Sequence, residues 1–203
     1  MDRADVIVLW VDPERPDDTA IEAAVSALAR GELVVLPTET VYGLAADPRV
    51  AGAMDRLYRV KARPEGKPVT RLAASVEQVA TEAGGLTPAA EKLARRFWPG
   101  PLTLVLETTG GFEGFRVPAH AVALAVLRRA GHVLAVTSAN RSGAPPSRTA
   151  PDAMRSLGGC VAVALDAGAS PGGVASTVVR VRGGEIEVLR PGAIPESEIR
   201  DRA

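Results

Sequence analysis

Hydrophobic and polar positions follow two patterns along the chain, one typical of strands and one typical of helices. Together these patterns predict an α/β fold. Short, mostly apolar runs bounded by Gly, Pro or polar residues are typical of strands. Such runs predict strands at residues 6–10, 33–36, 69–74, 102–106, 133–136, 161–165, 177–181 and 185–189. Apolar residues at helical spacing predict helices over about residues 19–30, 50–59, 87–97, 120–130 and 151–157.

Capping residues indicate where two of these helices begin. Thr19 and Glu22 form the capping-box pattern Thr-x-x-Glu at the start of an apolar stripe, and Gly31 is the expected end of that helix. Thr87 is followed by Pro88, a residue favoured at the first position of a helix. These signals predict helix starts at residues 19 and 87.

The order of the elements predicts a mixed sheet. Strands and helices alternate at first, whereas strands dominate near the C-terminus, where Gly183-Gly184 is the expected hairpin turn. We therefore expect an α/β fold, a twisted mixed β-sheet with flanking helices. A length of 203 residues with no long linker predicts a single domain over residues 1–203.

Composition and charge exclude several classes of protein. The lone Cys160 cannot form an intrachain disulfide, and with only two histidines the chain has too few soft ligands for a zinc site, so no metal site is expected. The 24 Lys and Arg residues balance 24 Asp and Glu residues, which argues against a wholly basic nucleic-acid coat protein. No signal peptide or membrane-spanning run is recognisable, so we expect a cytoplasmic protein.

The two common phosphate-binding motifs are absent. No two glycines stand at positions i and i+2, which excludes the dinucleotide fingerprint G-x-G-x-x-G. The one Gly-Lys pair, Gly66-Lys67, is followed by Pro68 and lacks the first glycine of a P-loop. A nucleotide would therefore be bound in another way.

The densest basic segment, Arg56–Arg71, offers such a way. It holds six of the cations, and with Asp55 and Glu65 counted against them its local net charge is +4. Pro64 disfavours a helical conformation at the preceding residue, and in an extended stretch Lys61 and Arg63 would project to the same side. Together with Lys67 they could clamp a polyphosphate. A solvated basic helix end is the alternative.

Small polar residues stand at the ends of several predicted strands, where ligands of open α/β sheets gather. They belong to the segment Pro37-Thr38-Glu39-Thr40, to Ser138 and Asn140, and to Ser176. Arg116, in or near an extended segment, could pair with a carboxylate. Each feature alone also fits an ordinary turn or surface residue, but together they suit a polar pocket. No paired carboxylates or Ser-His-Asp set can be proposed, so no catalytic residue is assigned.

Seven blocks of sequence, in order, resemble the YrdC-like family of threonylcarbamoyl-AMP synthases. The resemblance covers about residues 18–195, and the chain is similar to the single-domain form of the family. The blocks are residues 36–44 (LPTETVYGL), 61–68, 96–104 (RFWPGPLTL), 116–120 (RVPAH), 137–143 (TSANRSG), 176–178 (STV) and 189–194 (LRPGAI).

This resemblance implies a fold, a reaction and partners. The implied fold is a twisted mixed sheet with a concave basic face. The implied reaction converts L-threonine, bicarbonate and ATP, with Mg²⁺ carried on the ATP phosphates, into threonylcarbamoyl-AMP and pyrophosphate. Proteins of a threonylcarbamoyl transferase complex would then modify the adenosine beside the anticodon of ANN-decoding tRNA.

The resemblance also implies roles for individual residues. The residues expected to bind ATP are Lys61, Arg63, Lys67, Ser138, Asn140 and Arg190, with Lys61 in a supporting role. The residues expected to bind threonine are Thr40, Arg116, Val136 and Ser176, with Arg116 pairing with the carboxylate and Val136 acting through its backbone.

The sequence departs from the family pattern at two places. Leu72 stands where relatives often carry a histidine, so no threonine contact is assigned there. The segment Gly111–Phe115 replaces a strand that often brings a hydroxyl to the nucleotide, so a rebuilt pocket wall is expected. Two other functions stay open at this point: a non-catalytic module that binds tRNA or double-stranded RNA, and a carbamoyl transferase module.

Overall fold

The computed structural model describes residues 6–62 and 68–200 of the chain. Its strands are β1 (Ile7–Trp10), β2 (Val34–Leu36), β3 (Gly43–Ala46), β4 (Thr70–Leu72), β5 (Leu102–Thr108), β6 (Gly111–Arg116), β7 (Leu134–Ser138), β8 (Val163–Asp166), β9 (Thr177–Arg182) and β10 (Glu185–Arg190). Its helices are α1 (Asp18–Ala29), α2 (Ala53–Lys61), α3 (Val76–Ala83), α4 (Pro88–Phe97), α5 (Ala121–Ala130), α6 (Ala150–Leu157) and α7 (Glu196–Arg200).

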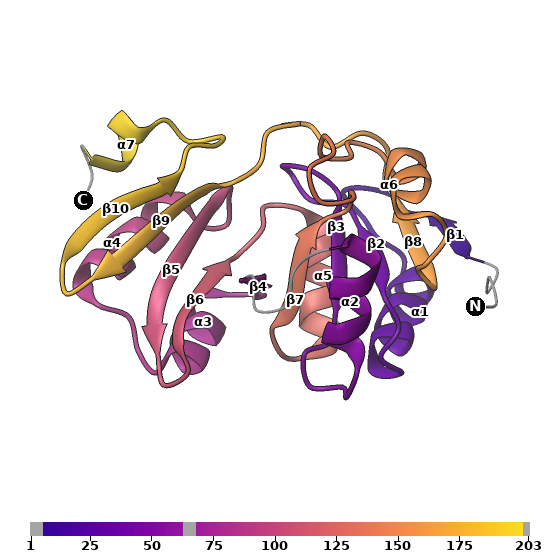
Figure 1. The fold of residues 1–203 in the computed structure, drawn as a ribbon, viewed down its shortest axis with the longest axis horizontal. Coiled ribbons are helices and arrows are strands. Elements are labelled where there is room, and N and C mark those ends of the chain that lie inside the picture. The colour runs from indigo at the N-terminus through magenta and orange to yellow at the C-terminus, as the bar shows by residue number, and fades with distance from the viewer. Residues whose placement is uncertain (1–5, 63–67, 201–203) are drawn as a thin grey trace.

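All of these strands join one mixed, twisted sheet, as expected (Figure 1). Their order is β1-β8-β2-β3-β7-β4-β6-β5-β9-β10. Parallel pairs such as β2 with β8 and β5 with β9 alternate with antiparallel pairs such as β3 with β7 and β9 with β10. The short strand β4 pairs with β7 on one side and β6 on the other, so three residues connect the two halves of the sheet.

Helices cover both faces of the half that contains β8, β2, β3 and β7. On one face α1 and α5 pack against residues such as Val34, Leu36 and Leu134 in one apolar cluster. On the other face α2 and α6 pack against Val35 and Leu44 in a second cluster. This explains why β2 and β3 are apolar and buried at every position.

The half formed by β6, β5, β9 and β10 is covered on one face only. Leu102, Leu104 and Leu106 of β5 point toward α3 and α4 and belong to a third apolar cluster, with Phe115 and Val179 of the neighbouring strands. The residues between them on β5, Thr103 and Val105, point to the opposite face, since side chains of a strand alternate. Thr103 and Val105 line a cavity on that opposite face.

The N-terminal caps of α4 and α1 can be compared with the predicted helix starts. Thr87 caps α4 as predicted, because its hydroxyl accepts a hydrogen bond from the backbone N–H of Ala90. The prediction for α1 was wrong by two residues: Asp17 is the cap, and its carboxylate accepts from the N–H of Ala20. Thr19 lies inside the first turn, because the stronger carboxylate acceptor two residues earlier already satisfies the free N–H.

Several elements were not predicted from the pattern. The strand β3 reads Gly-Leu-Ala-Ala and has little intrinsic strand preference, so its form depends on pairing with β2 and β7. The strand β6 contains two glycines, and α3 and α7 are short. The predicted hairpin at Gly183-Gly184 is confirmed, with both residues at positive φ.

Candidate functional site

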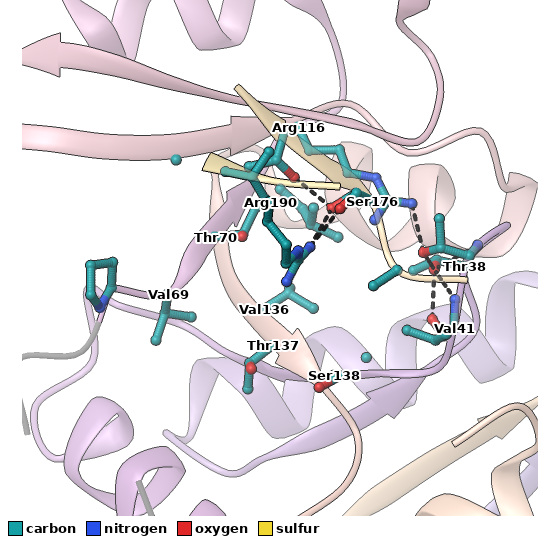
Figure 2. A pocket seen from close by; sticks show the side chains of 18 of the residues that line it. Thr38, Val41, Val69, Thr70, Arg116, Val136, Thr137, Ser138, Ser176 and Arg190 are labelled. Carbon is teal, nitrogen blue, oxygen red and sulfur yellow. Dashed lines mark hydrogen bonds between the residues drawn. The ribbon is translucent and has the colours of Figure 1, made fainter. Parts of the chain in front are cut away.

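A cavity of about 610 Å³ lies on the uncovered face, where the two halves of the sheet meet (Figure 2). Strands β3 to β7, β9 and β10 contribute to its wall, together with the loop between β2 and β3. Its polar lining residues are Thr38, Thr40, Thr70, Thr103, Arg116, Thr137, Ser138, Asn140, Ser176, Arg180 and Arg190. The cavity thus collects the polar strand-end residues that the sequence predicted.

Arg116, at the end of β6, is the most strongly fixed cation of the wall. Its side chain is only 8% exposed, and Nη2 lies 2.7 Å from Oε1 of Glu39. The same Nη2 donates to the hydroxyl of Thr40 (2.9 Å), and Nε donates to the carbonyl of Gly100 (3.1 Å). The remaining nitrogen, Nη1, makes no hydrogen bond within residues 6–62 and 68–200, so it is available to an anion.

The carboxylate of Glu39 supports Arg116 from outside the cavity. Its neighbours Thr38 and Thr40 line the cavity, whereas Glu39 does not. Its oxygens are buried and accept no hydrogen bond from the described residues, so Arg116 is their nearest countercharge. A buried carboxylate needs such a partner, and the pair therefore fixes where the guanidinium stands.

Two hydroxyls of the β2–β3 loop contact each other beside Arg116. Oγ1 of Thr38 lies 2.9 Å from Oγ1 of Thr40 and donates to the carbonyl of Val41 (2.6 Å). The backbone of this loop is held by Gly172 and Gly173, whose N–H groups donate to the carbonyls of Glu39 and Thr40. A Cβ on Gly172 would lie 2.7 Å from the Glu39 carbonyl oxygen, so this close approach requires glycine.

Ser176 joins the opposite wall to Arg190, the second cation of the site. The hydroxyl of Ser176 lies 2.8 Å from that of Thr103, and Arg190 Nη2 donates to the carbonyl and the hydroxyl of Ser176 (2.6 and 3.2 Å). Figure 2 shows Arg190 and Arg116 on either side of Ser176. Burial, and then the nearby charge of Arg116, lower the pKa of Arg190. An anion in the cavity would therefore be attracted to both cations.

Lys61 does not lie in an extended stretch, so this prediction was wrong. It is the last residue of α2 and is 2% exposed. Its ammonium group donates to the carbonyls of Ser138 (2.6 Å) and Asn140, and lies 3.5 Å from the Ser138 hydroxyl. These contacts show that Lys61 fixes the loop that follows β7. Its supporting role in ATP binding stays a prediction.

The segment from Val136 to Asn140 forms one edge of the cavity. Val136 and Ser138 line it, and Gly43 of β3 packs so closely that a Cβ there would meet Val136 Cγ1 at 2.6 Å. The amide nitrogen of Asn140 donates to the carbonyls of Arg141 and Ala144, so the side chain shapes the loop. Its amide oxygen is buried and has no partner among the described residues.

Arg63 and Lys67, the two other cations of the predicted clamp, lie outside the described residues. Their phosphate-binding roles, and the basic character of the concave face, stay predictions.

The two departures from the family pattern both fall on the cavity wall. Leu72 lines the cavity and is also part of an apolar cluster, so it contributes an apolar surface. On β6, Phe112, Gly114 and Arg116 face the cavity in turn. Phe112 is 40% exposed, and the guanidinium of Arg180 stands 5.9 Å from its ring centre. The wall at this position is therefore aromatic.

His120, just before α5, is a titratable group near this wall. Burial lowers its pKa, and the charge of Glu39 opposes that shift. Its Nδ1 is buried and has no hydrogen-bond partner in residues 6–62 and 68–200.

The role of Thr103 was not predicted, although its sequence contained a signal. It is a polar residue between Leu102 and Leu104, and strand alternation places it on the face opposite the leucines. Glu39 was noticed only as part of a polar turn. Its pairing with Arg116, 77 positions away in the chain, could not be read from spacing.

Two kinds of feature are absent from the described part of the chain. Within it, no cluster of His, Cys, Asp and Glu side chains could hold a metal ion. Within it, too, no helix is long and apolar enough to cross a membrane.

The fold and the site define a mixed α/β sheet protein with a preformed pocket for a small anionic ligand. Its described wall holds three arginines, Arg116, Arg180 and Arg190, and hydroxyls from three different segments supply directional hydrogen bonds.

Comparisons with known proteins identify the family. The model of the Sua5_yciO_yrdC family, described as "Telomere recombination", matches residues 26–192. A threonylcarbamoyl-AMP synthase of Pyrococcus abyssi is 38% identical over 196 residues, which cover 92% of this chain and 58% of that protein. A putative threonylcarbamoyl-AMP synthase of Mycobacterium tuberculosis is 39% identical over 198 residues, covering 93% of this chain and 90% of that protein.

A solved structure agrees with this result. The crystal structure of P. abyssi Sua5 complexed with L-threonine matches with a TM-score of 0.91 and 35% identity, covering 97% of this chain and 60% of that one. The chain therefore belongs to the Sua5_yciO_yrdC family. It spans less than two thirds of the length of the P. abyssi relative.

Proposed function

We propose that the protein is an L-threonylcarbamoyladenylate synthase. It converts L-threonine, bicarbonate and ATP into threonylcarbamoyl-AMP and pyrophosphate, and is thus a nucleotidyltransferase acting in tRNA modification. The observation that carries the proposal is the guanidinium of Arg116. It is buried, held on three sides, and keeps Nη1 available at the cavity wall, which suits a ligand carboxylate.

The proposed threonine subsite lies between Arg116 and Ser176. Arg116 binds the carboxylate, and Thr40 and Ser176 bind the polar groups of the ligand beside it. Val136 contributes through its backbone. Support comes from the fact that all four residues line the same cavity, and from the relative whose structure contains L-threonine.

The proposed ATP subsite occupies the rest of the cavity. Arg190 contacts ATP, and Ser138 lies on the opposite edge (Figure 2). Asn140 also lines the cavity. Lys61 holds the backbone that presents Ser138 and Asn140. Arg63 and Lys67 contact the phosphates in this proposal, and Mg²⁺ arrives bound to the phosphate oxygens.

The proposed chemistry depends on positioning and charge. The amine of threonine takes up carbon dioxide, derived from bicarbonate, and loses a proton to form a carbamate. A carbamate oxygen attacks the α-phosphorus, and the bond to the bridging oxygen of pyrophosphate breaks. Cations around the phosphates stabilise the charge that develops on the departing pyrophosphate. The cytoplasm is the proposed location, and tRNA and the proteins of a transferase complex are the proposed users of the product.

Pyrophosphate release measured with each substrate omitted tests the proposal. We expect release only when ATP, threonine and bicarbonate are all present, and the adenylate should be detected by mass. Release that does not depend on threonine would exclude this function. RNA binding unaffected by ATP and threonine, together with no release, would instead indicate an RNA-binding module.

The phosphate contacts are tested by Arg63→Ala and Lys67→Ala. Each variant should lower the rate by about a hundredfold, because a cation beside the phosphates stabilises the charge that develops on the departing pyrophosphate. The unfolding midpoint should stay unchanged. Arg30→Ala, which removes an exposed cation that does not line the cavity, is the matched control and should keep full activity. Full activity in both test variants would remove the clamp from the proposal.

A further inference from the structure

The wall beside Arg116 contains a hydroxyl whose hydrogen-bonding direction is fixed by its neighbours. Oγ1 of Thr38 and the carbonyl oxygen of Val41 are 2.6 Å apart, and a carbonyl cannot donate. The single hydroxyl proton of Thr38 must therefore lie between these two oxygens. Thr38 has no second proton to offer to Thr40.

The same reasoning assigns the proton of Thr40. The two threonine hydroxyls lie 2.9 Å apart, and only Thr40 still has a proton available, so Thr40 donates to Thr38. The Thr38 oxygen also accepts two longer contacts, of 3.3 Å each, from the backbone N–H groups of Thr40 and Val41. Thr40 also accepts a hydrogen bond from Nη2 of Arg116. One lone pair of its oxygen is left, so toward a ligand in the cavity Thr40 can only accept.

This acceptor, the hydroxyl oxygen of Thr40, stands next to Arg116, whose Nη1 makes no hydrogen bond within the described residues. A ligand that matches this wall carries an anionic oxygen beside an N–H group, as an α-amino acid does with its carboxylate and amine. An acceptor suits an amine that is to react, because it takes an N–H and leaves the nitrogen lone pair unoccupied.

We propose that Thr38 is a specificity-determining positioning residue, which fixes Thr40 as a hydrogen-bond acceptor for the amine of an α-amino acid. This inference rests on the proposed function for the identity of the ligand, threonine. Thr38 acts through Thr40, and its effect should disappear when Thr40 has no hydroxyl.

Calorimetric titration of the whole chain with L-threonine tests the proposal. Thr38→Val keeps the shape of the side chain and removes the hydroxyl, so the Kd for threonine should rise about tenfold. Thr38→Ser should bind like the unmodified protein. Thr81→Val, which removes an exposed hydroxyl on α3, is the matched control and should leave the Kd unchanged.

A double-mutant cycle separates action through Thr40 from a general loss of structure. Thr38→Val made in a Thr40→Val background should add no more than a twofold change, because the hydroxyl that Thr38 orients is then absent. The KM for ATP should stay within about twofold in Thr38→Val. Full additivity in the cycle, or a folded Thr38→Val with unchanged Kd, would overturn the proposal.

A second ligand keeps the test decisive if Thr38→Val does not fold. The threonine analogue with hydrogen in place of the amino group should bind at least about tenfold more weakly than threonine to both the unmodified protein and Thr38→Ser. Equal binding of the two ligands would also overturn the proposal. Absence of any threonine binding to the unmodified protein would instead contradict the proposed function.

Discussion

The two halves of the sheet are built from the same kinds of elements, but helices cover both faces of one half and only one face of the other. Around β2, β3 and β8 both faces carry helices, and consecutive residues Val34 and Val35 are each fully buried in different apolar clusters. Around β5 and β9 one face carries helices and the other lines the cavity. There the consecutive residues Val178 and Val179 divide between the cavity wall and the core.

The difference teaches where this fold can place a ligand. A sheet face that packs against helices has no room for polar side chains, because each would need a buried partner. The uncovered face allows Thr103, Arg116 and Ser176 to stand on strands or at strand ends, backed by a rigid apolar layer. One half therefore supplies stability on both faces, and the other combines a core with a binding wall.

The largest expected effect comes from breaking the buried pair on the binding wall. Arg116→Met should abolish threonine binding and lower the free energy of unfolding by about 3 kcal/mol, because Glu39 is left buried without a countercharge. Urea denaturation and threonine titration measure the two effects. Adding Glu39→Gln should restore much of the stability without restoring binding. A lone Arg116→Met with unchanged stability would show that the pair does not matter to the fold.

The same substitution, valine to alanine, at four positions compares how strongly each half of the sheet depends on buried side chains for its stability. Val34→Ala, Val35→Ala and Val179→Ala each remove methyl groups from a closed core and should cost about 2 kcal/mol. Val178→Ala, on the cavity wall, should cost less than about 1 kcal/mol. The free energies come from urea denaturation. Equal losses at Val178 and Val179 would contradict the one-sided burial of β9.

Lys61 lies in the doubly covered half but supports the binding wall. Lys61→Met keeps the buried methylene chain and removes the donor to the carbonyls of Ser138 and Asn140, so it should lower the free energy of unfolding by about 2 kcal/mol. It should also raise the KM for ATP. Lys92→Met, on the exposed surface of α4, is the matched control and should change the free energy of unfolding by less than about 0.5 kcal/mol.

The smallest expected effect is a pH dependence from His120. Burial lowers the pKa of His120 below its usual value of 6.5, so the unfolded chain binds a proton at a higher pH than the folded protein does. Stability should therefore fall as the pH drops below about 6.5 and should be independent of this group above it. His120→Gln should flatten the change of the urea midpoint between about pH 5.5 and about pH 8. An equal slope in the variant would assign the pH dependence to other groups.

Much of the fold was predictable because its signals are local. The apolar runs identified β2, β5, β8 and β9, and the Thr-Pro pair located the start of α4 correctly. The strands β3 and β6 were missed, since their alanines and glycines have no preference for a strand and their pairing comes from neighbours distant in sequence.

The residues of the candidate site could be predicted from the sequence, but the contacts between them could not. Thr40, Ser138, Ser176 and the two arginines could be named, because polar residues at strand ends and family blocks are visible in the chain. The contact of Glu39 with Arg116, and of Thr103 with Ser176, joins segments more than 70 residues apart. No periodicity encodes such contacts.

The sequence by itself determined the α/β class, the polar residues at strand ends and the family, because propensity, alternation and ordered motifs are properties of short segments. The tertiary structure decided which face of the sheet stays uncovered, that Lys61 is buried under the loop it supports, and which way the hydroxyls of Thr38 and Thr40 point. These features depend on distances between atoms brought together only by folding, since a hydrogen bond extends little beyond 3 Å and its direction is set by every partner at once.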